Sequence, residues 1–184
     1  MPTILKKTIL LIFLAILSAC EQQAEIENPN KIFTDSEVKE LNWMVSEFDS
    51  ILASKYKAGS VEENYKNYLK DTENYTFPIL NGMDKLGVQV MNLSVFSKIW
   101  WRYDNSLGNS GNYNIDAESE YLVYLKHIGE SNDFIENYAD KFSSAHDINP
   151  SVASEFSYRI KDVDLSDKNY RLIFAIHYLT LFNR

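Results

Sequence analysis

Four consecutive residues, Trp100-Trp101-Arg102-Tyr103, form the group in this sequence that is best suited to bind another molecule. Aromatic faces and a guanidinium can stack on sugars, peptides or other rings. At helical spacing, however, Trp100 can enter the core while Trp101 and Arg102 cover a neighbouring element. We favour core packing for the cluster as a whole. If a ligand or partner is bound here, Trp101, Arg102 and Tyr103 are the candidate contacts.

The histidines do not form a metal site by their spacing. None of His127, His146 and His177 stands in a pattern with another histidine or a carboxylate that would bind zinc from one helix. His177 lies in a strongly apolar segment, and we expect it to be a hydrogen-bonded core residue. No serine occupies a nucleophile-elbow pattern, and there is a single cysteine. We therefore expect no catalytic residue, metal or cofactor, and interpret the chain as a non-enzyme.

Two acidic stretches resemble calcium loops only in part. Asp104-Asn105-Ser106 lacks the glycine that an EF-hand loop needs at its sixth position, and in the stretch from Asp162 to Asp167 an aspartate occupies that position. Ile173 stands where the bidentate glutamate of the second loop would be. We interpret both stretches as loops and helix caps.

The N-terminal segment has the three-part order of a secretory signal. Lys6 and Lys7 give a positive start, residues 9–17 are uninterruptedly apolar, and Ser18 and Ala19 are small. The apolar run is much shorter than the roughly 18–20 residues of a permanent membrane span. We expect residues 1–19 to be removed from the mature protein.

The four residues Leu17-Ser18-Ala19-Cys20 resemble the lipobox of bacterial lipoproteins, a likeness that covers about the first tenth of the chain. The resemblance implies cleavage between Ala19 and Cys20 and lipid on the Cys20 sulfur. Cys20 is the only cysteine, so no intrachain disulfide can form. Glu21 follows it, whereas the family's inner-membrane retention signal is an aspartate. We therefore expect a cell-envelope location, with the outer membrane favoured and the membrane face left open.

The charge of the chain excludes one class of partner. Without Lys6 and Lys7, 16 of the 18 basic residues remain against 26 acidic ones, so the formal charge after cleavage is −10. A chain of this charge repels phosphate backbones, and we expect no nucleic-acid binding.

The many Asn-Tyr pairs have no constant period and do not indicate repeats.

The remaining sequence predicts an all-α domain of six or seven helices over residues 34–184, after a lipidated cysteine and flexible tether at residues 20–33. Helical spacing of apolar residues and capping residues place the helices. The expected helix starts are Thr34 with Glu37, Ser60 with Glu63, Pro78, Asp116, Ser131, Asn149-Pro150 and Ser166. We expect the first helix to end at Gly59, the third near Tyr103 and the fourth at Gly129, with a long loop over Asp104–Asn114. The segment after Ser166 is apolar nearly all round, which is typical of a buried central helix.

These features predict an envelope lipoprotein whose helical domain binds another envelope protein. The alternative is a small-molecule or glycan-binding lipoprotein that uses the Trp100–Tyr103 cluster. Neither the partner nor the oligomeric state follows from the sequence.

Overall fold

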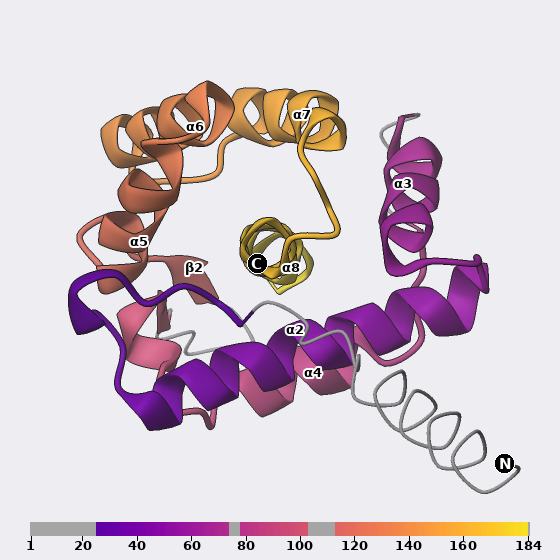
Figure 1. Ribbon diagram of the computed structural model, residues 1–184, viewed down its shortest axis with the longest axis horizontal. Coiled ribbons are helices and arrows are strands. Elements are labelled where there is room, and N and C mark those ends of the chain that lie inside the picture. The colour runs from indigo at the N-terminus through magenta and orange to yellow at the C-terminus, as the bar shows by residue number, and fades with distance from the viewer. Residues whose placement is uncertain (1–24, 74–77, 103–112, 184) are drawn as a thin grey trace, which may run out of the picture.

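The computed structural model describes residues 25–73, 78–102 and 113–183, which form seven α-helices and one pair of short strands (Figure 1). The helices are α2 (Asp35–Tyr56), α3 (Val61–Thr72), α4 (Met83–Val90), α5 (Glu120–Gly129), α6 (Asp133–Ala145), α7 (Pro150–Arg159) and α8 (Lys168–Phe182). Three-residue 3₁₀ turns are η1 (Pro29–Lys31), η2 (Phe96–Lys98) and η3 (Ile160–Asp162), and the strands are β1 (Trp100–Arg102) and β2 (Tyr113–Ile115). The predicted all-α class is confirmed. No helix in the described ranges is both long and apolar enough to cross a membrane.

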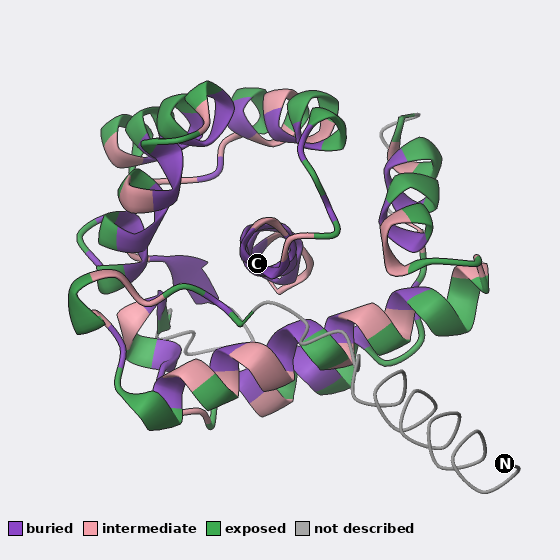
Figure 2. Cartoon of the chain, viewed as in Figure 1, coloured by how far each residue is buried: buried purple, intermediate pink, exposed green. Residues whose placement is uncertain are grey.

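Helix α8 is the centre of the domain. Figure 1 looks along its axis, with α2, α3, α5, α6 and α7 arranged around it, and in Figure 2 the buried faces of these helices point inward. Twelve of the 15 residues of α8 are buried, as its apolar sequence predicted. Each fully buried side chain such as Phe174 contributes about 1.5–3 kcal/mol relative to an exposed one. The core is therefore built from many small contributions around this one helix.

Capping residues fix where the helices begin. The Thr34 hydroxyl accepts from the Glu37 backbone N–H at 3.3 Å, and the Glu37 carboxylate accepts from the Thr34 N–H at 2.7 Å. This capping box satisfies two backbone donors of the first turn of α2. The Asn149 side chain caps α7 by accepting from the backbone N–H groups of Ser151 and Val152, and Pro150 occupies the first helical position. Both predicted helix starts are confirmed.

Four predicted boundaries are displaced by one to three residues. Helix α2 ends at Tyr56, because Lys57 takes the left-handed conformation (φ 52°) that was expected near Gly59. The other three differences concern N-caps: Ser119 precedes α5, Asn132 caps α6 and Asp167 caps α8, in place of Asp116, Ser131 and Ser166. The Asn132 and Asp167 side chains accept from backbone N–H groups of the first turn, as the expected caps would, whereas the Ser119 side chain makes no such bond.

The predicted third helix, from Pro78 to near Tyr103, is wrong. Helix α4 begins only after Gly82, whose φ of 101° suits glycine. It ends at Val90, and the chain continues through turns and η2 into β1. Strand β1 pairs antiparallel with β2, with Trp101 opposite Asn114. The β-branched and aromatic residues of this stretch favour a strand once a partner strand is available.

Residues 25–33 form a strap that packs on the domain, whereas a flexible tether was predicted to extend to Phe33. Ile26 and Phe33 are buried in the core. The side chain of Asn28 binds both the N–H and the carbonyl of Phe33, which closes a turn through η1. The packed domain therefore begins before residue 34, because two apolar side chains flank a turn that the sequence alone suggested to be coil.

Candidate functional site

The predicted aromatic cluster lies on β1, where its side chains alternate between the two faces of a strand. Trp100 is buried, and its indole Nε1 donates to the Thr180 hydroxyl of α8 at 2.8 Å. Its ring lies 5.5 Å from that of Phe96 and 5.2 Å from that of Tyr113, measured between centroids. Trp100 is thus a core residue, as favoured, but through a strand and not through a helix.

Trp101 and Arg102 remain at the surface on this fixed strand. The Trp101 side chain is 44% exposed. The Arg102 guanidinium donates to the Met91 carbonyl at 2.8 Å and lies 5.3 Å from the centroid of the Phe96 ring. The Arg102 side chain is held by these two contacts, and the Trp101 backbone is fixed by the pairing of β1 with β2, which limits the freedom that Arg102 loses on binding. Tyr103 and most of the predicted Asp104–Asn114 loop lie outside the described residues, as do Leu17, Ser18, Ala19 and Cys20.

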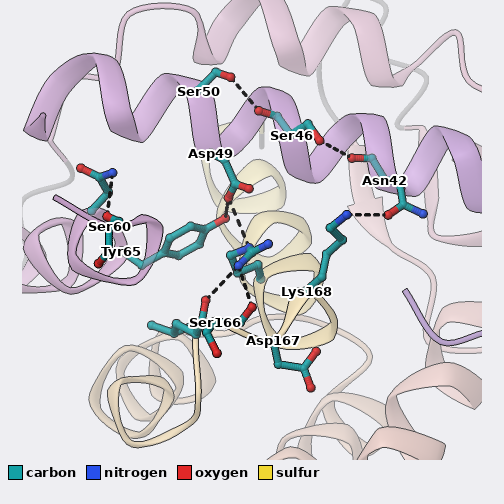
Figure 3. A network of polar contacts seen from close by, with 12 residues as sticks. Asn42, Ser46, Asp49, Ser50, Ser60, Tyr65, Ser166, Asp167 and Lys168 are labelled. Atoms are coloured by element: carbon teal, nitrogen blue, oxygen red, sulfur yellow. Dashed lines mark hydrogen bonds and ion pairs between the residues drawn. The ribbon is translucent and has the colours of Figure 1, made fainter. Parts of the chain in front are cut away.

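A second candidate is a network of polar side chains between α2, α3 and α8. The Tyr65 hydroxyl of α3 donates to Asp49 Oδ1 of α2 at 2.7 Å, and Arg171 Nε of α8 lies 3.5 Å from the same oxygen (Figure 3). Arg171 is almost completely buried, and its Nη1 donates to the carbonyls of Leu165 and Ser166 at 3.2 and 2.9 Å. One buried cation thereby connects the loop before α8 to α2.

The electrostatics of this network are set mainly by burial. Desolvation raises the pKa of Asp49, against the opposing effects of the Tyr65 hydrogen bond and the charges of Arg171 and Lys168. Burial, together with the nearby Asp49 carboxylate, raises the pKa of Tyr65 well above its usual value. Lys168 donates to the Asn42 side chain at 3.0 Å, so α8 contacts α2 at two polar points. The geometry is that of a structural ion pair that aligns three helices.

Sequence reasoning missed this network. Its one signal is Arg171, a charged residue directly before the apolar run of Leu172–Ile176, which requires a partner if it is buried. Nothing in the spacing identifies Asp49 as that partner.

A third candidate is a polar cleft between the strap, the α5–α6 turn and the first turn of α8. It has a volume of about 390 Å³. His127 Nε2 lies 3.5 Å from a Glu27 carboxylate oxygen, and His127 Nδ1 lies 3.7 Å from one of Glu130. Asp167 adds a third carboxylate to the lining, and Tyr170 adds a phenol. We refer to this hollow as the polar cleft.

The structure places the other predicted residues in structural roles. His177 stacks on Phe156 with centroids 3.8 Å apart, and its Nδ1 is 3.0 Å from the Tyr138 hydroxyl, which confirms a hydrogen-bonded core histidine. His146 is the left-handed C-cap residue of α6. Asp164 accepts hydrogen bonds from the backbone N–H and the hydroxyl of Ser166 in the turn before α8, as a cap or loop residue would. Across the described part of the chain, no group of three or more His, Cys, Asp or Glu side chains could hold a metal ion.

Comparison with known proteins gives no relative. No protein-family model matches the chain, and no curated protein or solved structure is significantly similar to it. Its function must therefore be inferred from its own geometry.

Proposed function

We propose that this chain is a cell-envelope lipoprotein, anchored through lipid on Cys20, whose helical domain binds another envelope protein through Trp101 and Arg102. The observation that carries the binding site is the 44% exposure of Trp101 on a strand whose other face is fixed by buried Trp100. Tryptophan and arginine are among the residues that dominate the binding energy of protein interfaces. A pre-positioned pair of this kind is a suitable contact for a partner.

A binding role fits the chemistry better than a catalytic one. The polar groups that are brought together inside the domain, Asp49, Tyr65 and Arg171, join α2, α3 and α8 through a hydrogen bond and an ion pair. The surface pair Trp101 and Arg102 offers stacking and hydrogen bonding but no proton-transfer group.

The anchor is supported by the likeness of Leu17-Ser18-Ala19-Cys20 to a lipobox. Two or three acyl chains attach a protein stably, whereas one chain binds marginally. Glu21 after the cysteine favours the outer membrane. Substitution Cys20→Ala should abolish membrane retention of the mature form, which lacks residues 1–19; quantitative retention of that form in the membranes would rule out the lipid anchor.

A glycan or small-molecule ligand is the second candidate, because the exposed Trp101 ring can stack on a sugar ring. A protein-binding domain should retain an envelope protein when no sugar is added, whereas a glycan-binding domain should retain a soluble sugar when no other protein is present.

The test is affinity capture from crosslinked envelopes with full-length, C-terminally tagged protein. Three baits are compared: wild type, Trp101→Ala and Tyr158→Ala. Tyr158 is a matched control, since it is an aromatic residue on α7 that is 67% exposed. We expect one envelope protein to be enriched with wild type and Tyr158→Ala and lost with Trp101→Ala. Equal enrichment with all three baits would remove Trp101 from the interface.

Two further outcomes separate the candidates. Loss of cooperative unfolding in Trp101→Ala would show that its ring is needed for packing and not for contact. If folded, lipidated bait enriches no protein but binds a soluble oligosaccharide in a Trp101-dependent manner, the glycan candidate replaces the protein partner.

A further inference from the structure

The strap and the candidate binding strand are attached to opposite ends of α8. In the first turn, the Asn169 side chain accepts from the Glu27 backbone N–H at 2.8 Å. At the other end, Thr180 accepts from Trp100, and the Asn183 carbonyl accepts from the Tyr113 N–H at 3.1 Å. Eleven residue steps of α-helix separate Asn169 from Thr180, which is about 17 Å along the axis at 1.5 Å per residue. The domain therefore has two poles defined by one rigid element.

The strap also limits how far the first pole can move from a membrane. Ile26 is buried, so the chain is part of the folded domain from this residue onward. Only six residue steps separate Cys20 from Ile26. Fully extended, they reach about 20–22 Å at 3.3–3.6 Å per residue. A tether that ran freely to Thr34 would reach more than twice as far.

The surface beside this attachment point is acidic. The polar cleft has three carboxylates, on Glu27, Glu130 and Asp167, and one imidazole, on His127. The Glu27 and Glu130 side chains are 56% and 76% exposed. A negative surface is repelled by anionic headgroups and is compatible with the ammonium groups of zwitterionic ones.

We propose that the face around the polar cleft is the membrane-proximal face, held against the headgroup layer of a zwitterionic bilayer, and that the Trp101–Arg102 surface therefore points away from the membrane. The proposal rests on the lipid anchor at Cys20 proposed above. Its physical basis is the short connection from Cys20 to Ile26, the buried strap and the negative charge around the polar cleft. The partner protein would therefore bind on the side of the domain that faces away from the membrane.

The orientation can be measured with one dye position at each pole. Lipidation consumes the sulfur of the only cysteine, so an introduced cysteine is the single free thiol. Glu130→Cys reports on the polar cleft. Val88→Cys reports on the other pole, because Val88 is 53% exposed and the adjacent Gly87 packs directly against Asn183. Full-length lipidated protein is placed in vesicles of phosphatidylethanolamine and phosphatidylcholine that carry acceptor-labelled headgroups.

We expect energy transfer to the headgroups to be stronger from position 130 than from position 88, because the two ends of α8 that these positions mark lie about 17 Å apart along its axis. Inserting about ten Gly and Ser residues before Glu25 lengthens the connection between Cys20 and the domain without changing the domain itself. This insertion should reduce the difference in energy transfer between the two positions. Replacing part of the lipid with anionic phosphatidylglycerol at low salt should lower transfer from position 130. Equal transfer from both positions, or stronger transfer from 88, would overturn the proposed orientation.

The outcomes distinguish the two proposals. Protein that lacks lipid by mass and does not float with the vesicles overturns both the anchor and the orientation. Lipidated, vesicle-bound protein with equal transfer from both poles overturns the orientation alone. Transfer from position 130 that is unchanged by phosphatidylglycerol overturns the charge complementarity.

Discussion

Substitution Thr180→Val tests how strongly the central helix holds the candidate binding strand. The Thr180 hydroxyl accepts the Trp100 indole N–H at 2.8 Å, in a fully buried contact between residues 80 positions apart. Valine has nearly the shape of threonine but offers no acceptor, so the indole N–H is left buried and unpaired. Leaving such a donor unsatisfied costs about 1–3 kcal/mol.

Other consequences of the substitution are small. The Thr180 hydroxyl also donates to the Ile176 carbonyl at 2.7 Å, but that carbonyl is the ordinary helical partner of the Thr180 N–H. Threonine and valine have similar helix propensities. We therefore expect the free energy of unfolding to fall by about 1–3 kcal/mol, measured by urea denaturation with an unchanged denaturant slope.

A double-mutant cycle isolates the hydrogen bond from these side effects. Trp100→Phe removes the donor and leaves the Thr180 hydroxyl bound to Ile176. In that background Thr180→Val should cost only a few tenths of a kcal/mol, which gives a coupling energy of about 1–2 kcal/mol for the pair. If Thr180→Val destabilises both backgrounds equally, the hydrogen bond does not hold the strand and the reasoning fails.

Three more predictions concern the polar network and the α5–α6 turn. Burial places the pKa of Asp49 above its unfolded value, so the contribution of Asp49 to stability is fully present below pH about 4 and is lost as the pH rises through the folded pKa. Urea denaturation from pH about 4 upward should show that the free energy of unfolding of wild type falls relative to that of Asp49→Asn. A rise of wild type relative to the variant would contradict a raised pKa of Asp49. Tyr65→Phe should cost about 1.5–3 kcal/mol, because it removes a hydrogen bond to a charged group, and should raise the pKa of Asp49 further, as seen by NMR titration; an unchanged pKa would refute the contact. In Gly129→Ala the new Cβ would lie 2.8 Å from Glu136 Cα. We therefore expect overpacking to lower the free energy of unfolding by about 1–3 kcal/mol, and with it the thermal midpoint. A thermal midpoint equal to that of wild type would show that α6 can move away.

The sequence predicted those parts of the fold that depend on local chemistry. The capping box of Thr34 and Glu37 and the Asn149-Pro150 start each need only neighbouring residues. The central position of α8 followed from apolar residues on all its faces. Each of these signals is complete within a few turns of helix.

The remaining features depend on residues that meet only in the folded chain. Strand β1 has three residues, too few to show alternation, and its conformation depends on pairing with Tyr113–Ile115. The strap depends on Ile26 and Phe33 finding space in the core. Asp49 and Arg171 are distant in sequence, and a buried arginine predicts that a carboxylate is near without saying which one.

The position of α8 in the chain has a consequence for how the domain folds. All the helices that surround α8 precede it in sequence, and α2, which begins at Asp35, contacts it directly. Until α8 has emerged, those helices have no common surface on which to bury their apolar faces. Contacts of such long sequence separation slow folding, because the connecting chain must be ordered before they form. The domain would thus remain unfolded until nearly its whole length is available, which for the export proposed above is the state that a membrane translocation channel requires.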